Sequence, residues 1–132
     1  MKKTLALCSA LLLAACSTPT PPDRASLAGE VFYLQRIALP PAATLNVELQ
    51  DISRADAPAI TLARQAGPVK GNVPLPFQLS YDPTQIQPGH RYAVRARIEL
   101  DGQLLFINTT QQAVNLDGHD AQPLRIKLDP AR

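Results

Sequence analysis

Cys16 is the residue of this chain whose surroundings point most directly to a chemical reaction. In front of it lie a basic start at residues 2–3, an apolar run at residues 5–13 and two alanines at residues 14–15. This three-part layout is typical of a secretory signal peptide. Cys16 is a lone cysteine at the junction between this apolar run and a stretch rich in proline, serine and threonine, a position suited to modification of its thiol.

The sequence Leu-Ala-Ala-Cys at residues 13–16 resembles the lipobox of bacterial lipoproteins. The resemblance implies that the cysteine is acylated on its sulfur and becomes the new N-terminus after cleavage. We therefore expect residues 1–15 to be a lipoprotein signal peptide and Cys16 to carry the lipid that anchors the protein. The alternative is an ordinary signal peptide with an incidental cysteine. Ser17 follows in place of an aspartate, which by resemblance to proteobacterial sorting favours the outer membrane, with the domain in the periplasm. The sequence does not decide which face of that membrane carries it.

Removal of the signal peptide changes the charge of the protein. The whole chain has 13 basic and 11 acidic residues, but Lys2 and Lys3 leave with the signal, so the mature chain has 11 of each. A neutral chain lacks the dominant basic surface that nucleic-acid binding needs. Cys8 also leaves with the signal, so the mature chain has no pair of cysteines for an internal disulfide.

Few residues of the mature chain are suited to catalysis or metal binding. The two histidines, His90 and His119, lie in turn-like sequences, and residues 117–120 have neither the spacing nor the ligand count of a calcium or zinc site. Ser53 and Ser80 could serve as nucleophiles, but neither lies in a glycine-rich elbow. We predict a protein that is not an enzyme and has no catalytic residues, cofactor or metal.

Three arginines form a candidate contact site. Arg95 and Arg97 alternate on the polar face of one predicted strand, and Arg91 lies just before them. Their guanidinium groups could bind an anionic glycan, a lipid headgroup or an acidic partner segment through paired hydrogen bonds. The alternative is that these charges only keep the face of a sheet soluble.

The segment at residues 104–107, Leu-Leu-Phe-Ile, is apolar on both faces of a strand. We expect it to be buried beneath the connection at residues 65–73. If it were exposed instead, it would present a hydrophobic stripe that could accept a strand or helix of a partner protein.

These residues must be positioned by a tether and a single domain. Residues 16–26 are rich in proline and contain no large apolar side chain, so they are predicted to form an extended tether. Residues 27–132 then form one domain of ordinary size. The 13 prolines, spread along the chain, argue against long helices.

The dominant hydrophobic period of the domain is two residues, which is typical of strands with one buried and one wet face. Turn signals separate the segments, and Asp101–Gly102 is a strong hairpin signal. We predict an all-β domain, an antiparallel β-sandwich of about seven strands, with a small β-barrel as the alternative. The clearest strands are residues 45–50, 77–81, 92–100 and 124–128, and the weaker ones are residues 29–37, 60–63 and 104–109.

Several of these segments, in this order and spacing, resemble the YbaY/YscW family of bacterial envelope lipoproteins. They are residues 29–33, 37–43, 45–51, 74–77, 81–82, 92–98 and 104–106. The resemblance covers nearly the whole domain and implies a β-sandwich. One branch of the family contains pilotins, which chaperone secretin subunits of type III secretion systems to the outer membrane. The other is a general YbaY-like branch, which is the safer assignment for this sequence. The resemblance carries over no catalytic residues.

Two functions therefore remain open. The resemblance implies a membrane-anchored, non-enzymatic interaction or assembly module, with pilotin-like chaperoning of an envelope protein such as a secretin as its sharpest form. The alternative is a module that binds envelope glycan or lipid through its arginines. A hydrophobic groove would favour the first function, whereas a wet cleft lined by Arg95 and Arg97 beside aromatic residues would favour the second.

Overall fold

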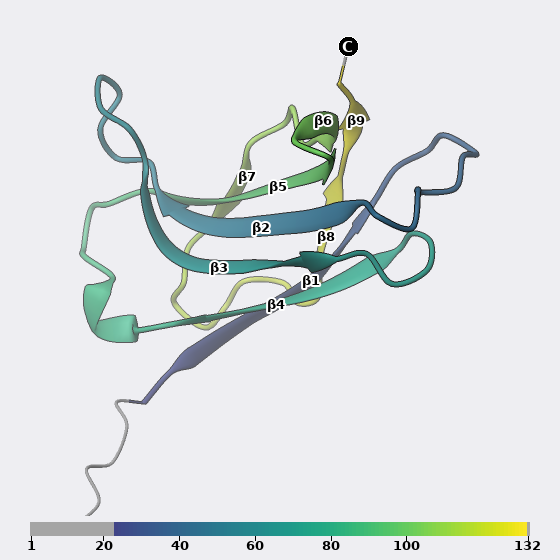
Figure 1. The fold of residues 1–132 in the computed structure, drawn as a ribbon. Helices are drawn as coiled ribbons and strands as arrows, with labels where there is room; N and C mark the ends of the chain where they lie inside the picture. Colours follow the sequence, from purple (N-terminus) through teal and green to yellow (C-terminus); the bar gives the residue numbers. More distant parts are fainter. Residues whose placement is uncertain (1–22, 132) are drawn as a thin grey trace, which may run out of the picture.

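The structure is a computed structural model that describes residues 23–131, and it consists of two β-sheets (Figure 1). The smaller sheet has the strand order β4-β1-β8, and the larger has the order β3-β2-β5-β6-β9, with β7 also paired to β5. The strands are β1 (Ala25–Phe32), β2 (Thr44–Asp51), β3 (Ile60–Pro68), β4 (Leu75–Tyr81), β5 (Tyr92–Leu100), β6 (Gln103–Ile107), β7 (Gln112–Val114), β8 (Leu124–Lys127) and β9 (Asp129–Pro130). The predicted β-sandwich is confirmed, since the strands form two separate sheets and not one closed sheet.

The two-residue period of the sequence appears directly as alternating burial. In β4, Leu75, Phe77, Leu79 and Tyr81 are buried while the three residues between them are exposed. Because successive side chains of a strand point to opposite faces, one face of each sheet can pack against the other sheet. The core between the sheets is made almost entirely of aliphatic and aromatic side chains.

The only helix within residues 23–131 is a short 3₁₀ turn, η1 (Pro83–Gln85), between β4 and β5. Asp82 caps its first turn by accepting a hydrogen bond from the Thr84 amide. No helix in this part of the chain is long and apolar enough to cross a membrane.

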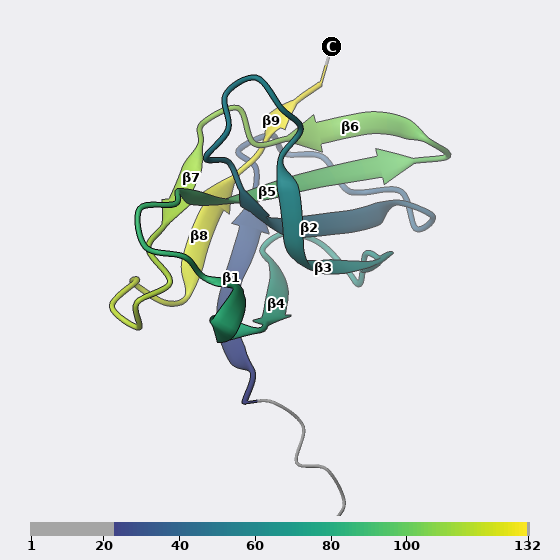
Figure 2. The same cartoon turned by 90° about the vertical axis from the view of Figure 1, so that its left-hand side faces the viewer.

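The first strand departs from the sequence prediction in two ways. It begins at Ala25, two residues before the predicted start of the domain, and it ends at Phe32, so that residues 33–37 belong to the following loop. It also lies between β4 and β8 (Figure 2), antiparallel to β4 but parallel to β8. A parallel neighbour requires a distant strand of the chain, which no local period of two can indicate.

The predicted cover of the apolar strand at residues 104–107 is wrong. Residues 65–68 belong to β3, which forms the opposite edge of the larger sheet, with β2 and β5 between β3 and β6. Phe106 is instead buried by the loop that follows β1, where the Tyr33 ring stacks on it with a centroid distance of 4.3 Å. The order of strands in the larger sheet, which the sequence does not indicate, keeps residues 65–68 away from β6.

Candidate functional site

The three arginines do not converge on one site. The Nε atom of Arg97 lies 3.0 Å from Oε1 of Glu99, so the charge of Arg97 is balanced on its own strand. Arg91 is exposed at the entrance to β5, and its backbone amide donates a hydrogen bond to the Ser53 hydroxyl. Arg95 is thus the one of the three that lines a hollow.

The hollow beside Arg95 has a volume of about 220 Å³ and lies where β5 changes partner from β6 to β7. Asn108 bridges this break, because its side chain accepts a hydrogen bond from the Ala96 amide and donates one to the Val94 carbonyl. Gln50 and Gln111 also line the hollow, and the residues found around it include no aromatic ring on which a sugar could stack. No sequence signal had marked Asn108 as a bridging residue.

The turn before β5 contains a network of polar residues that sequence reasoning missed. His90 Nδ1 lies 2.6 Å from Oδ2 of Asp51 at the end of β2, and the Ser53 hydroxyl donates a hydrogen bond to the other carboxylate oxygen. Burial on its own raises the pKa of Asp51, but the hydrogen bonds from His90 and Ser53 outweigh it and lower the pKa to about 2.

This network lacks the geometry of a nucleophile and its base. In a catalytic triad the serine hydroxyl is hydrogen-bonded to the histidine, which in turn is oriented by the carboxylate. Here Ser53 is bound to the Asp51 carboxylate and the Arg91 amide, so that it joins two segments of backbone. The other candidate nucleophile, Ser80, accepts a hydrogen bond from Arg24 Nε. His119 lies in an exposed turn beside Asp117, and residues 23–131 contain no cluster of three potential metal ligands.

An apolar groove lies beside β6. Its walls are the loop residues 37–40 on one side and Leu105, Phe106 and Pro130 on the other, and its volume is about 290 Å³. The Tyr33 hydroxyl donates a 2.6 Å hydrogen bond to the Ile37 carbonyl, which fixes the loop against β6. Ile37, on the rim, is 58% exposed. The apolar segment at residues 104–107 thus has two roles: Phe106 is buried, and Leu105 and Phe106 line a groove on the surface.

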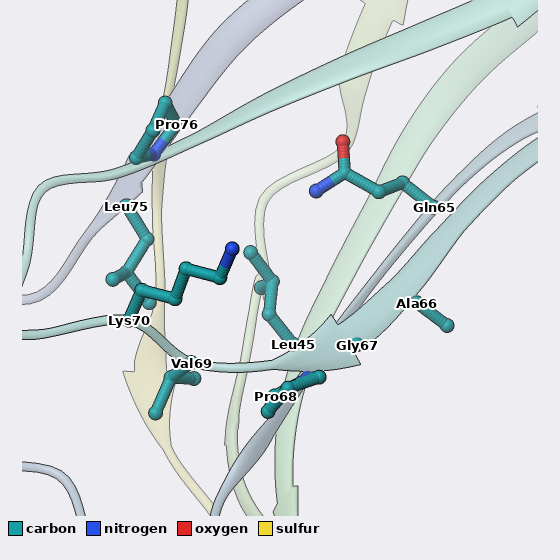
Figure 3. Close-up of a pocket in the computed structure, with 9 residues that line it drawn as sticks. All are labelled: Leu45, Gln65, Ala66, Gly67, Pro68, Val69, Lys70, Leu75 and Pro76. Carbon is teal, nitrogen blue, oxygen red and sulfur yellow. The ribbon is translucent and has the colours of Figure 1, made fainter.

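A second hollow, of about 380 Å³, lies between the end of β3 and the start of β4 (Figure 3). Leu45 and Leu75 provide its apolar part, and the side chains of Gln65 and Lys70 point into it. The Gln65 side-chain oxygen accepts a 2.7 Å hydrogen bond from the Gln78 amide and so connects β3 to β4. We call this hollow between the two strands the seam.

Comparisons with known proteins agree with this architecture. Residues 22–128 match the YscW family, described as type III secretion system lipoprotein chaperones. The uncharacterized lipoprotein YbaY of Escherichia coli strain K12 is 36% identical over 137 residues, which cover 87% of this chain and 72% of YbaY. An alternative pilotin from the type II secretion system of Vibrio cholerae is 43% identical, with a TM-score of 0.77, over 83% of this chain and 99% of the pilotin.

The family match begins before β1 and extends just beyond β8, so it includes nearly all of the sandwich. The resemblance seen in the order and spacing of the strand segments is thereby confirmed. This chain belongs to the YscW family of lipoprotein chaperones.

Proposed function

We propose that this protein is a pilotin-type lipoprotein, anchored in the outer membrane by a lipid on Cys16 and acting in the periplasm without catalysis. Its domain binds a segment of an envelope protein, such as a secretin subunit, and supports that protein's assembly in the membrane. The observation that carries this proposal is the 43% identity and TM-score of 0.77 to a pilotin that is covered over 99% of its length.

The apolar groove is the site best suited to such a client. Its walls are aliphatic, aromatic and proline side chains from three separate segments of the chain. A groove of this kind accepts the apolar face of an amphipathic helix, whose anchoring side chains recur every three or four residues. Burial of two or three such anchors contributes several kcal/mol, at roughly 25 cal/mol per Å² of apolar surface, from which the entropic cost of association is subtracted.

The alternative, an envelope glycan- or lipid-binding module, has one observation in its favour. Arg95 lines a hollow of mixed polar and aliphatic residues together with Gln50, Asn108 and Gln111, and these polar groups could bind an anionic group. The residues lining that hollow include no aromatic platform, and Arg97 is paired with Glu99. The chaperone function therefore has the stronger support.

The test is crosslinking in cells with the tagged, lipidated protein, followed by mass spectrometry of the captured envelope proteins. The wild-type protein is expected to capture a secretin or another single subunit of a membrane complex. Ile37→Asp places a charge on the rim of the apolar groove and should reduce this capture about tenfold or more, because the charge must be desolvated.

Ile60→Asp is the matched control, because Ile60 is 57% exposed at the start of β3, outside the apolar groove. Both variants should keep the β-sandwich, and Ile60→Asp should capture the client as the wild type does. If Ile37→Asp captures as much client as the wild type does, the client site lies outside the apolar groove. Failure of the wild type to capture any envelope protein would contradict the chaperone function and favour glycan and lipid ligands.

A further inference from the structure

The seam lies between two strands that do not pair with each other. β3 is hydrogen-bonded only to β2, and β4 only to β1, so each presents a sheet edge. Pro68 ends β3, and Pro76 is the second residue of β4. Because proline has no amide hydrogen, neither edge can complete a regular pattern of strand pairing at this point. The edges therefore remain apart, and a ligand there must be recognised mainly through side chains.

Two hydrogen-bond donors are directed into the same space. The Lys70 side chain extends from the loop after β3 across the seam, and Gln65 approaches from β3 with its amide nitrogen directed into the seam (Figure 3). The side-chain oxygen of Gln65 already accepts a hydrogen bond from the backbone amide of Gln78, and this bond fixes the orientation of the Gln65 side-chain amide. Within residues 23–131, Lys70 forms no ion pair and the Gln65 amide nitrogen makes no hydrogen bond to a protein acceptor.

The surroundings of these donors are apolar. Leu45 and Leu75 are buried beneath them, and Val69 and Pro76 lie beside them. An ammonium group and an amide N–H₂ that share an apolar hollow are complementary to one carboxylate with aliphatic groups next to it. A phosphate would be a poor match, because phosphate sites gather several cationic or backbone donors, whereas the seam offers one lysine and one amide.

We propose that the seam binds a short peptide segment that places an acidic side chain between aliphatic ones, with the carboxylate held by Lys70 and Gln65. The segment belongs to the client protein, so the inference rests on the proposed function. The seam would be a second contact site besides the apolar groove, and this second site selects for a negatively charged side chain. Together the two sites would require a client to carry both an apolar face and a nearby acidic residue.

The test uses the mature, lipidated protein in detergent micelles and two pentapeptides blocked at both ends, acetyl-Val-Leu-Glu-Leu-Val-amide and its glutamine counterpart. The glutamate side chain supplies the only carboxylate of the first peptide. Binding is followed by NMR through the Gln65 side-chain amide and the Lys70 backbone amide. We expect the glutamate peptide to shift both signals and to bind about tenfold more tightly than the glutamine peptide, as a charge-assisted hydrogen bond requires.

Lys70→Gln should reduce the affinity for the glutamate peptide to that for the glutamine peptide. Lys127→Gln is the matched control: it removes the same charge from the other lysine of the mature chain, on β8, and should leave the affinity unchanged. The inference is overturned if the two peptides bind equally, if Lys70→Gln has no effect, or if neither peptide shifts the Gln65 signal.

Inorganic phosphate is added in a parallel titration. If phosphate shifts these signals and the glutamate peptide does not, the seam is an anion site of another kind and the peptide proposal fails. Ile37→Asp should leave peptide affinity unchanged because it alters the apolar groove alone. Peptide binding by a wild-type protein that captures no envelope protein in cells would mean that the proposed function fails and the seam does not. Client capture without peptide binding would be a failure at the seam alone.

Discussion

At the scale of single residues, Gly29 shows how closely the smaller sheet is packed. Gly29 lies opposite Phe77 in the pairing of β1 with β4. A Cβ atom built on Gly29 would lie 2.5 Å from the tip of the Phe77 ring and 2.7 Å from the Leu124 carbonyl oxygen. The ring can move, but the carbonyl belongs to the paired backbone of β8 and cannot. The absence of a side chain at Gly29 is therefore what allows Phe77 to fill the core.

We expect Gly29→Ala to lower the free energy of unfolding by about 1–3 kcal/mol, the usual cost of overfilling a packed core. Urea denaturation of the mature protein measures this change. Gly67→Ala is the control, because a Cβ on Gly67 meets no atom within 4 Å. A Gly29→Ala protein as stable as the Gly67→Ala protein would show that β1 and β8 separate easily.

At the scale of the elements, the hydrogen bonds of Asp51 with His90 and Ser53 connect the end of β2 to the turn before β5. Asp51 has a side chain that is only 12% exposed, and it binds both His90 and Ser53. Its pKa is about 2, below the ordinary value of 3.8. A carboxyl group with a lowered pKa in the folded state stabilises the fold above its unfolded pKa, and this contribution disappears as pH falls through the folded pKa.

We therefore expect Asp51→Asn to destabilise the protein by about 1–3 kcal/mol at pH 7, because His90 and Ser53 lose a charged acceptor. The difference from wild type should shrink as the pH falls from about 4 to about 2, when Asp51 itself becomes neutral. Thermal unfolding at a series of pH values tests this. Asp56→Asn, a change of an exposed carboxylate in the neighbouring loop, should show no comparable dependence. A constant difference across the pH range would contradict this origin of the stability.

The elements also show which features of the fold the sequence predicts and which it does not. Alternation in residues 77–81 and 92–100 predicts strands and their buried faces, since each side chain's direction follows from its neighbours. Contacts between distant segments carry no such signal. Asp51 and His90 are 39 positions apart in the sequence, so no local pattern indicated their hydrogen bond. The same limit explains why the seam went unpredicted: it forms only where two strands from different sheets meet.

At the scale of the whole molecule, β1 lies along the chain between the predicted anchor at Cys16 and the loop that forms one wall of the apolar groove. The predicted tether, residues 16–26, overlaps the first two residues of β1, and the loop that follows β1 forms one wall of the groove (Figure 1). The strand's 8 residues span about 26 Å, at roughly 3.3 Å per residue. On the proposed function, a client in the groove is held at the end of β1 farther from the predicted tether. Anchoring and client binding would then use different parts of the protein.

This separation predicts that delivery and binding can be uncoupled. Cys16→Ala should prevent lipidation and release the protein into the soluble periplasm, while the domain, whose strands begin at Ala25, folds and captures its client as before. The client should then no longer reach the outer membrane efficiently, which fractionation of the cells would reveal. Cys8→Ala is the matched control, because Cys8 lies in the predicted signal peptide and its loss should leave localisation unchanged. A Cys16→Ala protein that still fractionates with the membrane would mean that another part of the protein supplies the attachment. Membrane release together with loss of client capture would show that the lipid, or the membrane itself, takes part in binding.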